Sequence, residues 1–166
     1  MQSDDPPSVF IRPMIPADRA AVADIVVSAG NFSQTEIECA LELVDIYLTD
    51  ERQTDYRVAV ALDRASKVHA YACWGPVPLT RGAFDLYWIA THPGSRGQGS
   101  GRALMAYVEG KVLELKGRLL AVETSSKLSY TSTVEFYRRL GYGETYRIGN
   151  FYDVGDDKLT LVKRLS

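Results

Sequence analysis

The chain reads LYWIATHP over residues 86–93, GSRGQGSGR over residues 94–102 and ALMAYVEGKVLELK over residues 103–116. The first segment is apolar and rich in aromatic residues, which is typical of a β-strand. It ends at Pro93, because proline has no N–H to give to a strand ladder. Apolar residues of the third segment then recur at helical spacing: Leu104, Val108, Val112 and Leu115. A strand, a glycine-rich loop and a helix are therefore predicted in this order.

This loop has the features of an anion-binding site. The first turn of a helix carries N–H groups without intrahelical partners and the positive end of the helix dipole. Glycines leave the backbone open to a ligand, so phosphate or pyrophosphate is the expected anion. Arg96 and Arg102 add positive charge on both sides of the glycines. The alternative is that the glycines only form a turn, but a turn does not need Gly97, Gly99 and Gly101 at alternate positions.

Two familiar phosphate-binding patterns fail here. A P-loop ends in Gly-Lys-Ser/Thr, whereas this loop ends in Gly101-Arg102-Ala103. The dinucleotide pattern Gly-x-Gly-x-x-Gly fails as well, because its last glycine would fall on Arg102 or Leu104. The pattern that fits is Arg/Gln-x-x-Gly-x-Gly/Ala, with Arg96, Gly99 and Gly101.

A second motif, EFYRRLGY at residues 135–142, follows about forty residues after the loop. Together the two motifs resemble the coenzyme A loop and the late Phe-Tyr helix of the GCN5-related N-acetyltransferase (GNAT) family. The resemblance covers roughly residues 84–142 and is weaker elsewhere. It implies an acetyl-coenzyme-A-dependent N-acetyltransferase that acts on a primary amine, expected to be a small molecule. One alternative is a non-catalytic acyl-coenzyme-A-binding or sensing module of the same fold. Another is a protein-interaction role for the helical hairpin at residues 17–50.

The resemblance also assigns a coenzyme-binding set. The pyrophosphate is expected on the loop amides, and the pantetheine arm along the edge of the preceding strand. The set is Ile89, Ala90, Thr91, Arg96, Gly97, Gln98, Gly99, Ser100, Gly101, Arg102 and Ser132. Ser132 is included because the family often has Asn seven residues before its tyrosine, where this chain has Tyr130. Nearby hydroxyl groups must then supply the polar contacts.

Three residues are candidates for catalysis. Tyr137 occupies the position of the family tyrosine, whose hydroxyl can donate a proton to the leaving thiolate, although a tyrosine here could also be core. Asp85 lies eleven residues before Arg96, where the histone-acetylating branch of the family has its glutamate base. Glu123 is the second candidate for the base. Either carboxylate could instead pair with an arginine, and proton removal could run through water. His92 is expected to be a surface residue.

The acceptor stays open among amino acids, polyamines, antibiotics and protein N-termini. Aromatic rings and carboxylates would suit a cationic amine. The candidates for such contacts are Trp74, Tyr87, Trp88, Tyr146, Phe151, Tyr152, Asp153, Asp156 and Asp157. The alternative is that the two tryptophans are core and the aspartates are solvated turn residues.

The element order is predicted as β-α-α-β-β-β-α-β-α-β-β, an α/β fold with a mixed sheet and helices on both faces. A single N-acetyltransferase-like domain is expected over residues 1–166, with a loose tail at residues 1–7. The predicted strands cover 9–12, 56–62, 67–74, 84–91, 119–122, 142–148 and 158–165, and the two late helices cover 99–116 and 132–140. A polar, aromatic loop is expected over residues 149–157.

Composition limits the partners. The net charge of −2 gives no basic excess for nucleic acid or an anionic membrane. There is no run of eighteen apolar residues for a membrane span. The opening MQSDDPP lacks the basic and apolar regions of a signal peptide, so a cytoplasmic location is expected. Two cysteines and two histidines show no metal-ligand spacing, so no metal is expected. A homodimer is possible.

Overall fold

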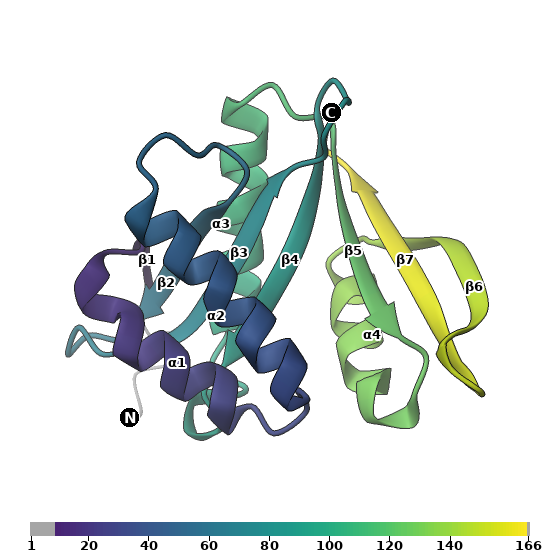
Figure 1. Ribbon diagram of the computed structural model, residues 1–166, viewed down its shortest axis with the longest axis horizontal. Helices are drawn as coiled ribbons and strands as arrows, with labels where there is room; N and C mark the ends of the chain where they lie inside the picture. Colours follow the sequence, from purple (N-terminus) through teal and green to yellow (C-terminus); the bar gives the residue numbers. More distant parts are fainter. Residues whose placement is uncertain (1–8, 166) are drawn as a thin grey trace, which may run out of the picture. The chain divides into compact units, whose positions relative to one another are not determined.

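The computed structural model describes residues 9–165. They form two compact units (Figure 1). The first unit comprises residues 9–75 and 88–108, and the second comprises residues 76–87 and 109–165. The single domain over residues 1–166 stays a prediction, and its tail at residues 1–7 lies outside the described residues.

The element order agrees with the sequence prediction. The strands are β1 (Phe10–Pro13), β2 (Arg57–Leu62), β3 (Val68–Pro76), β4 (Ala83–Thr91), β5 (Leu119–Ser125), β6 (Gly143–Asp153) and β7 (Asp156–Arg164). The helices are α1 (Arg19–Ser28), α2 (Gln34–Thr49), α3 (Ser100–Glu114) and α4 (Thr131–Arg139). Short 3₁₀ helices lie at Pro16–Asp18, Pro93–Ser95 and Leu128–Tyr130.

The strands form a seven-stranded sheet in the order β1-β2-β3-β4-β5-β7-β6. β4 and β5 pair in parallel over Ala83–Leu86 and Leu119–Val122, because α3 carries the chain back between them. The pairs β1–β2, β2–β3, β5–β7 and β6–β7 are antiparallel. The predicted mixed sheet is therefore confirmed.

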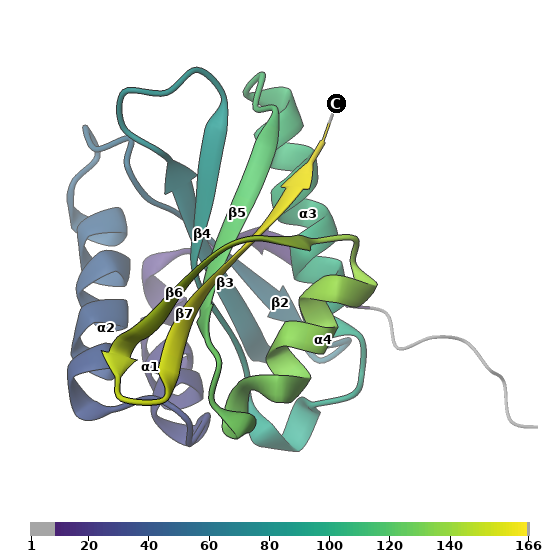
Figure 2. The same ribbon diagram turned by 90° about the vertical axis from the view of Figure 1, so that its right-hand side faces the viewer.

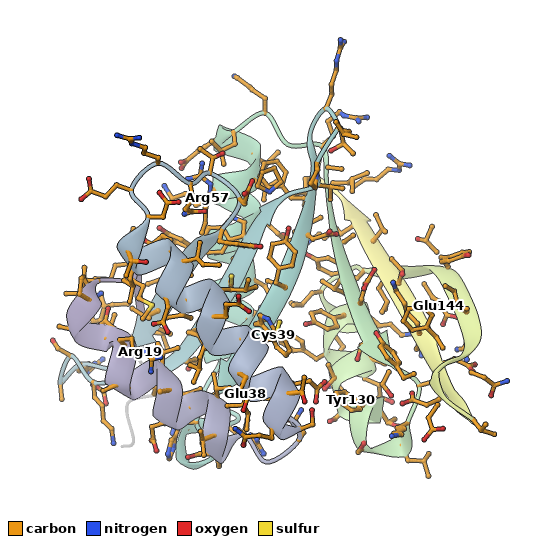
Figure 3. All side chains as sticks on the ribbon, in the orientation of Figure 1. Arg19, Glu38, Cys39, Arg57, Tyr130 and Glu144 are labelled. Atoms are coloured by element: carbon orange, nitrogen blue, oxygen red, sulfur yellow. The ribbon has the colours of Figure 1, made fainter. Side chains whose placement is uncertain are left out.

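In the first unit, α1 and α2 lie side by side on one face of β1–β3, and the first half of α3 lies on the other face (Figures 1 and 2). Helix α2 begins at a capping box in which Ser33 and Glu36 exchange hydrogen bonds, as the sequence predicts. Arg19 of α1, labelled in Figure 3, donates two hydrogen bonds of 2.9 Å to the carboxylate of Asp45 on α2 and so joins the two helices. The core between these layers contains Val22, Ile25, Val26, Ala40, Val44, Val58, Val60, Tyr71, Leu104 and Val108.

In the second unit, the sheet has one buried and one partly open face. Side chains that alternate along the strands point into the buried face: Phe84, Leu86, Leu120, Val122, Leu159 and Leu161. Helix α4 adds Val134 and Tyr137 to this core, and Tyr142 follows it. The opposite face carries Asp85, Glu123 and Lys158, none of which is fully buried. These three charged side chains therefore lie on the same face of the strands.

Helix α3 ends differently from the sequence prediction. The helix was expected to run to residue 116 but ends at Glu114, and Lys116 takes the left-handed conformation, with φ of 63°. Glycine is required at position 117 because a side chain there would clash with its neighbours. A Cβ there would lie 2.2 Å from a methyl carbon of Val112 and 2.9 Å from the Phe84 ring.

Gly117→Ala is accordingly expected to lower the free energy of unfolding by about 2–3 kcal/mol, the usual cost of overpacking. Urea denaturation would measure it. The matched control is Gly110→Ala on α3, where a Cβ meets no heavy atom within 4 Å. Because alanine favours a helix, this control should be more stable by about 0.5–1 kcal/mol. Equal stability of Gly117→Ala and the native chain would contradict the packing argument.

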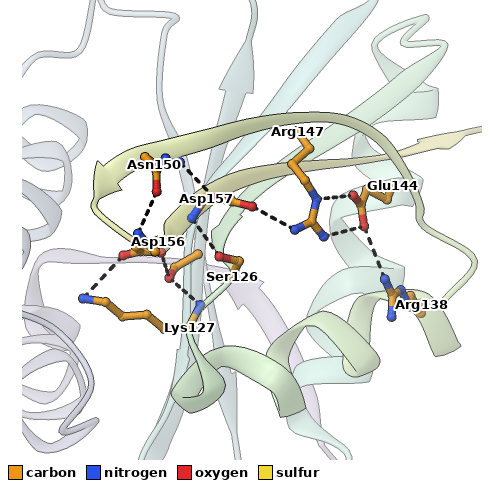
Figure 4. A network of polar contacts seen from close by, with 10 residues as sticks. Ser126, Lys127, Arg138, Glu144, Arg147, Asn150, Asp156 and Asp157 are labelled. Atoms are coloured by element: carbon orange, nitrogen blue, oxygen red, sulfur yellow. Dashed lines mark hydrogen bonds and ion pairs between the residues drawn. The ribbon is translucent and has the colours of Figure 1, made fainter.

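The C-terminal hairpin is longer than predicted. The expected loop at residues 149–157 is mostly strand, because β6 runs to Asp153 and β7 begins at Asp156. The turn is Val154-Gly155, and side chains replace regular pairing around it. Asn150 Oδ1 accepts a hydrogen bond from the Gly155 N–H, and its own N–H donates to Asp157 (Figure 4). This strand pairing was not predicted because residues 149–157 are mostly polar.

Candidate active site

The predicted site residues fall in both units. The glycine loop and residues 89–91 of β4 belong to the first unit, whereas Asp85, Glu123, Ser132 and Tyr137 belong to the second. Among these, the structure brings Asp85 and Glu123 together on one face of the second unit's strands. The glycine loop, the end of β4 and the Asp85–Glu123 pair each owe their local geometry to different neighbouring residues.

The glycine loop exposes its backbone. Gly97 and Gly99 have φ of 76° and 84°, a left-handed conformation that favours glycine. An added Cβ at either position would meet no heavy atom within 4 Å, so the space beside the backbone is open. The Gly99 carbonyl accepts the Ala103 N–H at 3.0 Å, which is the first hydrogen bond of α3. The N–H groups of Ser100, Gly101 and Arg102 therefore lack intrahelical partners and suit an anion.

Gly99→Val is expected to weaken coenzyme A binding at least tenfold, because a side chain would occupy the space that a pyrophosphate must enter. Calorimetry with coenzyme A would measure the dissociation constant. Gly155→Val is the matched control, since Gly155 also has positive φ, 78°, and open space around it. It should cause similar backbone strain and leave coenzyme affinity unchanged. An unchanged dissociation constant in Gly99→Val would exclude this loop as the site.

The loop is attached to α1 through two side chains. Arg96 donates a 2.8 Å hydrogen bond to the carbonyl oxygen of Ala29, at the end of α1. His92 accepts a hydrogen bond from the Gly94 N–H through Nδ1, and its Nε2 lies 3.6 Å from a carboxylate oxygen of Asp24. Part of the donor capacity of Arg96 is thus used within the protein. His92, expected to be a simple surface residue, organises the start of the loop.

Ser100 has an inward role that the sequence prediction missed. Its Oγ lies 2.6 Å from Nε2 of His69 on β3, and both residues are buried. Ser100 therefore offers its backbone to a ligand while its hydroxyl is bonded inside the first unit. The signal in the sequence was a polar residue at a helix position that faces the core.

The strand edge that was predicted to bind the pantetheine arm lies at the end of β4. The β4–β5 ladder pairs residues only as far as Leu86 and Val122. Ile89, Ala90 and Thr91 lie beyond the last pair, still within β4. Ser132 is exposed in the first turn of α4.

Tyr137 is 5% exposed and packs its ring against Phe136 and Tyr142, at centroid distances of 5.3 and 5.8 Å. Burial raises the pKa of Tyr137 far above its usual value, so the phenol stays protonated at neutral pH. No hydrogen-bond partner of its hydroxyl is found among residues 9–165. By contrast, the Tyr142 hydroxyl donates to Glu109 at 2.9 Å.

Asp85 and Glu123 share a face with Lys158. Burial raises the pKa of the Asp85 carboxyl, and the nearby Glu123 charge raises it further, while Lys158 acts in the opposite direction. The Lys158 Nζ lies 2.8 Å from Glu123 Oε1 and 4.8 Å from the centre of the Phe151 ring. Glu123 was expected at the end of its strand, but β5 continues to Ser125. Glu123 is therefore held in mid-strand with a cationic partner.

The aromatic candidates divide into two groups. Trp74 is 3% exposed and packs edge-on against Tyr107, so it belongs to the core. Trp88 packs edge-on against Phe32 of the same unit at 5.3 Å. Tyr146, Phe151 and Tyr152 on β6 are about half exposed, at 60%, 50% and 49%. The exposed aromatics of the second unit thus lie on the same hairpin as Lys158.

The aspartates of the hairpin do not all face solvent. Asp156 is 4% exposed, accepts a hydrogen bond from the Ser125 hydroxyl and lies 3.4 Å from the Lys127 ammonium (Figure 4). Asp157 accepts a hydrogen bond from Arg147 at 3.0 Å. The contacts of Asp156 attach the hairpin to the end of β5 and the residues that follow it, so the interpretation of solvated turn residues is wrong for Asp156.

Within residues 9–165, no cluster of three or more His, Cys, Asp or Glu side chains could hold a metal ion. None of the helices described is long and apolar enough to cross a membrane.

Comparisons with known proteins identify the class to which this fold and loop belong. A family model described as an acetyltransferase (GNAT) domain matches residues 54–144. The S-alkylcysteine N-acetyltransferase of Bacillus subtilis (strain 168) is 30% identical over 129 residues, covering 74% of this chain and 71% of that protein. The chain is thus an acetyltransferase. It belongs to the GNAT family, which confirms the resemblance read from the two motifs.

Solved structures agree with this assignment. A structure from Desulfovibrio desulfuricans, assigned to the GNAT acetyltransferases, is 38% identical with a TM-score of 0.91 and covers 96% of this chain and 100% of that one. The ribosomal-protein-S18-alanine N-acetyltransferase of Escherichia coli shares the fold at 20% identity and a TM-score of 0.76, over 96% of this chain and 95% of that one. The predicted acetyl-coenzyme A donor is confirmed at the level of the family.

Proposed function

We propose that this acetyltransferase transfers the acetyl group of acetyl-coenzyme A to the primary amine of a small molecule. The observation that supports an amine acceptor is the environment of Asp85. This carboxylate is partly buried, has a raised pKa and lies beside the Glu123–Lys158 pair. An ammonium group must lose a proton before it can attack a thioester, and a carboxylate with a raised pKa is suited to accept it. The S-alkylcysteine N-acetyltransferase relative makes S-alkylcysteines the first acceptors to test.

The donor is proposed to bind through the backbone. The N–H groups at the start of α3 would hold the pyrophosphate, and the edge at Ile89–Thr91 would pair with the pantetheine arm. Acetyl-coenzyme A supplies the activated thioester. The positive-φ glycines at positions 97 and 99 support this assignment, because they leave the backbone at the start of α3 open to an anion.

Two side chains are proposed for the proton transfers. Asp85 would take the proton from the acceptor ammonium, and Tyr137 would give one to the leaving thiolate. Glu123 is the weaker candidate for the base, because its carboxylate is already bound to Lys158 at 2.8 Å. The protonated, unpartnered phenol of Tyr137 supports its role as donor.

Release of coenzyme A thiol, followed with a chromogenic thiol reagent, tests the proposal. The acceptor panel should hold S-alkylcysteines, other amino acids, polyamines, aminoglycosides and peptides with free N-termini. We expect turnover with a small-molecule amine and mass-spectrometric detection of one added acetyl group. Turnover only on peptides would overturn the small-molecule assignment. Tight coenzyme binding without turnover on any acceptor would favour a sensing module.

A further inference from the structure

We propose that His69 is a positioning residue for the coenzyme loop, which it holds at both ends. The backbone carbonyl of His69 accepts the His92 N–H at 2.8 Å, where the loop begins. Its ring Nε2 lies 2.6 Å from the Ser100 hydroxyl, where the loop passes into α3. One residue of β3 thus contacts both ends of the segment 92–100. The inference rests on the proposed function, in which this segment binds the pyrophosphate.

The contacts of the His69 ring show which member of the His69–Ser100 pair donates the hydrogen bond. His69 Nδ1 lies 3.3 Å from the Lys67 carbonyl oxygen, which can only accept, so Nδ1 carries the ring proton. In the tautomer with its proton on Nδ1, Nε2 is an acceptor, and the Ser100 hydroxyl donates to it. His69 and Ser100 are 4% and 2% exposed, so water cannot readily replace either partner.

The pair fixes the direction of the ligand-binding N–H groups. Ser100 is the first residue of α3, and its side-chain direction is tied to the rotation of the helix about its axis. A bond between its hydroxyl and a strand residue therefore restrains the first turn, whose N–H groups must converge on one anion. Without this restraint, the glycines on either side of Gln98 would leave the turn free to reorient.

A serine bonded to a histidine can also suggest a nucleophile and its base. The burial of this serine excludes acyl transfer through its oxygen, because no thioester can reach it. The contribution of the pair to the reaction is therefore made through the loop backbone.

The test compares two donors, acetyl-coenzyme A and S-acetyl-pantetheine, which share the thioester but differ in the pyrophosphate and nucleotide. The readout is the ratio of kcat/KM for the two donors. Ser100→Ala and His69→Leu should each lower this ratio about tenfold, because a loosened turn loses only the contacts to the pyrophosphate. Ser100→Thr, which keeps the hydroxyl, should restore most of the ratio. Thr49→Val, which removes an exposed α2 hydroxyl that donates to the Asp45 carbonyl oxygen, is the control.

If the pair had only a general structural role, the variants would lower kcat/KM equally for both donors. The ratio would then stay unchanged, and this result would overturn the proposal. If one variant does not fold, the ratio in the other decides. Combining Ser100→Ala with His69→Leu should cost little more than either change alone, because both remove one interaction. Failure of the proposed function is distinguishable: the native enzyme would then show no preference for acetyl-coenzyme A over S-acetyl-pantetheine.

Discussion

Replacing Asp85 with Asn is expected to lower kcat about 10³-fold with the best acceptor, within the range for loss of a positioned base. Asn keeps the size of the side chain but cannot take a proton. The base is active only when ionised, so native activity should rise with pH through the raised pKa of Asp85 and then level off. In Asp85→Asn this limb should move to the pKa of the acceptor amine. Measurement of kcat/KM between pH 5 and pH 10, with a series of acceptors of different basicity, would show the shift.

The variant Lys158→Met provides a second test of Asp85 as the base. The positive charge of Lys158 lowers the pKa of Asp85, whereas burial and Glu123 raise it. Removing the charge should therefore move the rising limb to higher pH without abolishing it. If Glu123→Gln loses the limb while Asp85→Asn keeps it, the base is Glu123. If neither variant moves it, proton removal runs through water.

Tyr137→Phe should lower the chemical rate about 10²-fold, the low end of general-acid effects, and change coenzyme affinity much less. The ring remains, so its packing against Phe136 and Tyr142 is kept. Single-turnover measurements with saturating acetyl-coenzyme A would isolate the chemical step.

Tyr142→Phe is the matched control for this prediction. It removes a hydroxyl that donates to Glu109 in the same unit, so it should lower stability rather than the chemical rate. A rate loss below threefold in Tyr137→Phe would identify Tyr137 as a core residue. Leaving-group dependence would sharpen the result, because a donor with a more acidic thiol should need the phenol less.

The features that were predictable from the sequence depend on neighbours along the chain. Glycine spacing indicated the loop, the Ser33–Glu36 pattern indicated the start of α2, and the EFYRRLGY motif indicated α4. Gly141 of the same motif follows this helix and has φ of 91°, the left-handed conformation that favours glycine. In each case the energetic cause lies within a few residues, so the sequence contains it.

The missed features depend on partners distant in sequence. Ser100 and His69 are 31 residues apart, and Arg96 and Ala29 are 67 apart. Asp156 is buried and contacts Ser125 and Lys127, which lie about thirty residues before it. Nothing in a local pattern distinguishes such an aspartate from a solvated one. The roles of Tyr137, Asp85 and the loop residues remain predictions that the variants above can test.

The loop offers backbone N–H groups at its helix end, while the Ser100 side chain is bonded elsewhere in the protein. Amide groups are common to every residue except proline, so their supply does not depend on which side chains stand at positions 98 and 102. Evolutionary drift at these exposed positions should therefore be tolerated more readily than at the glycines. Mutational scanning under selection for activity should find many substitutions tolerated at positions 98 and 102 and few at Gly97, Gly99 and the buried Ser100.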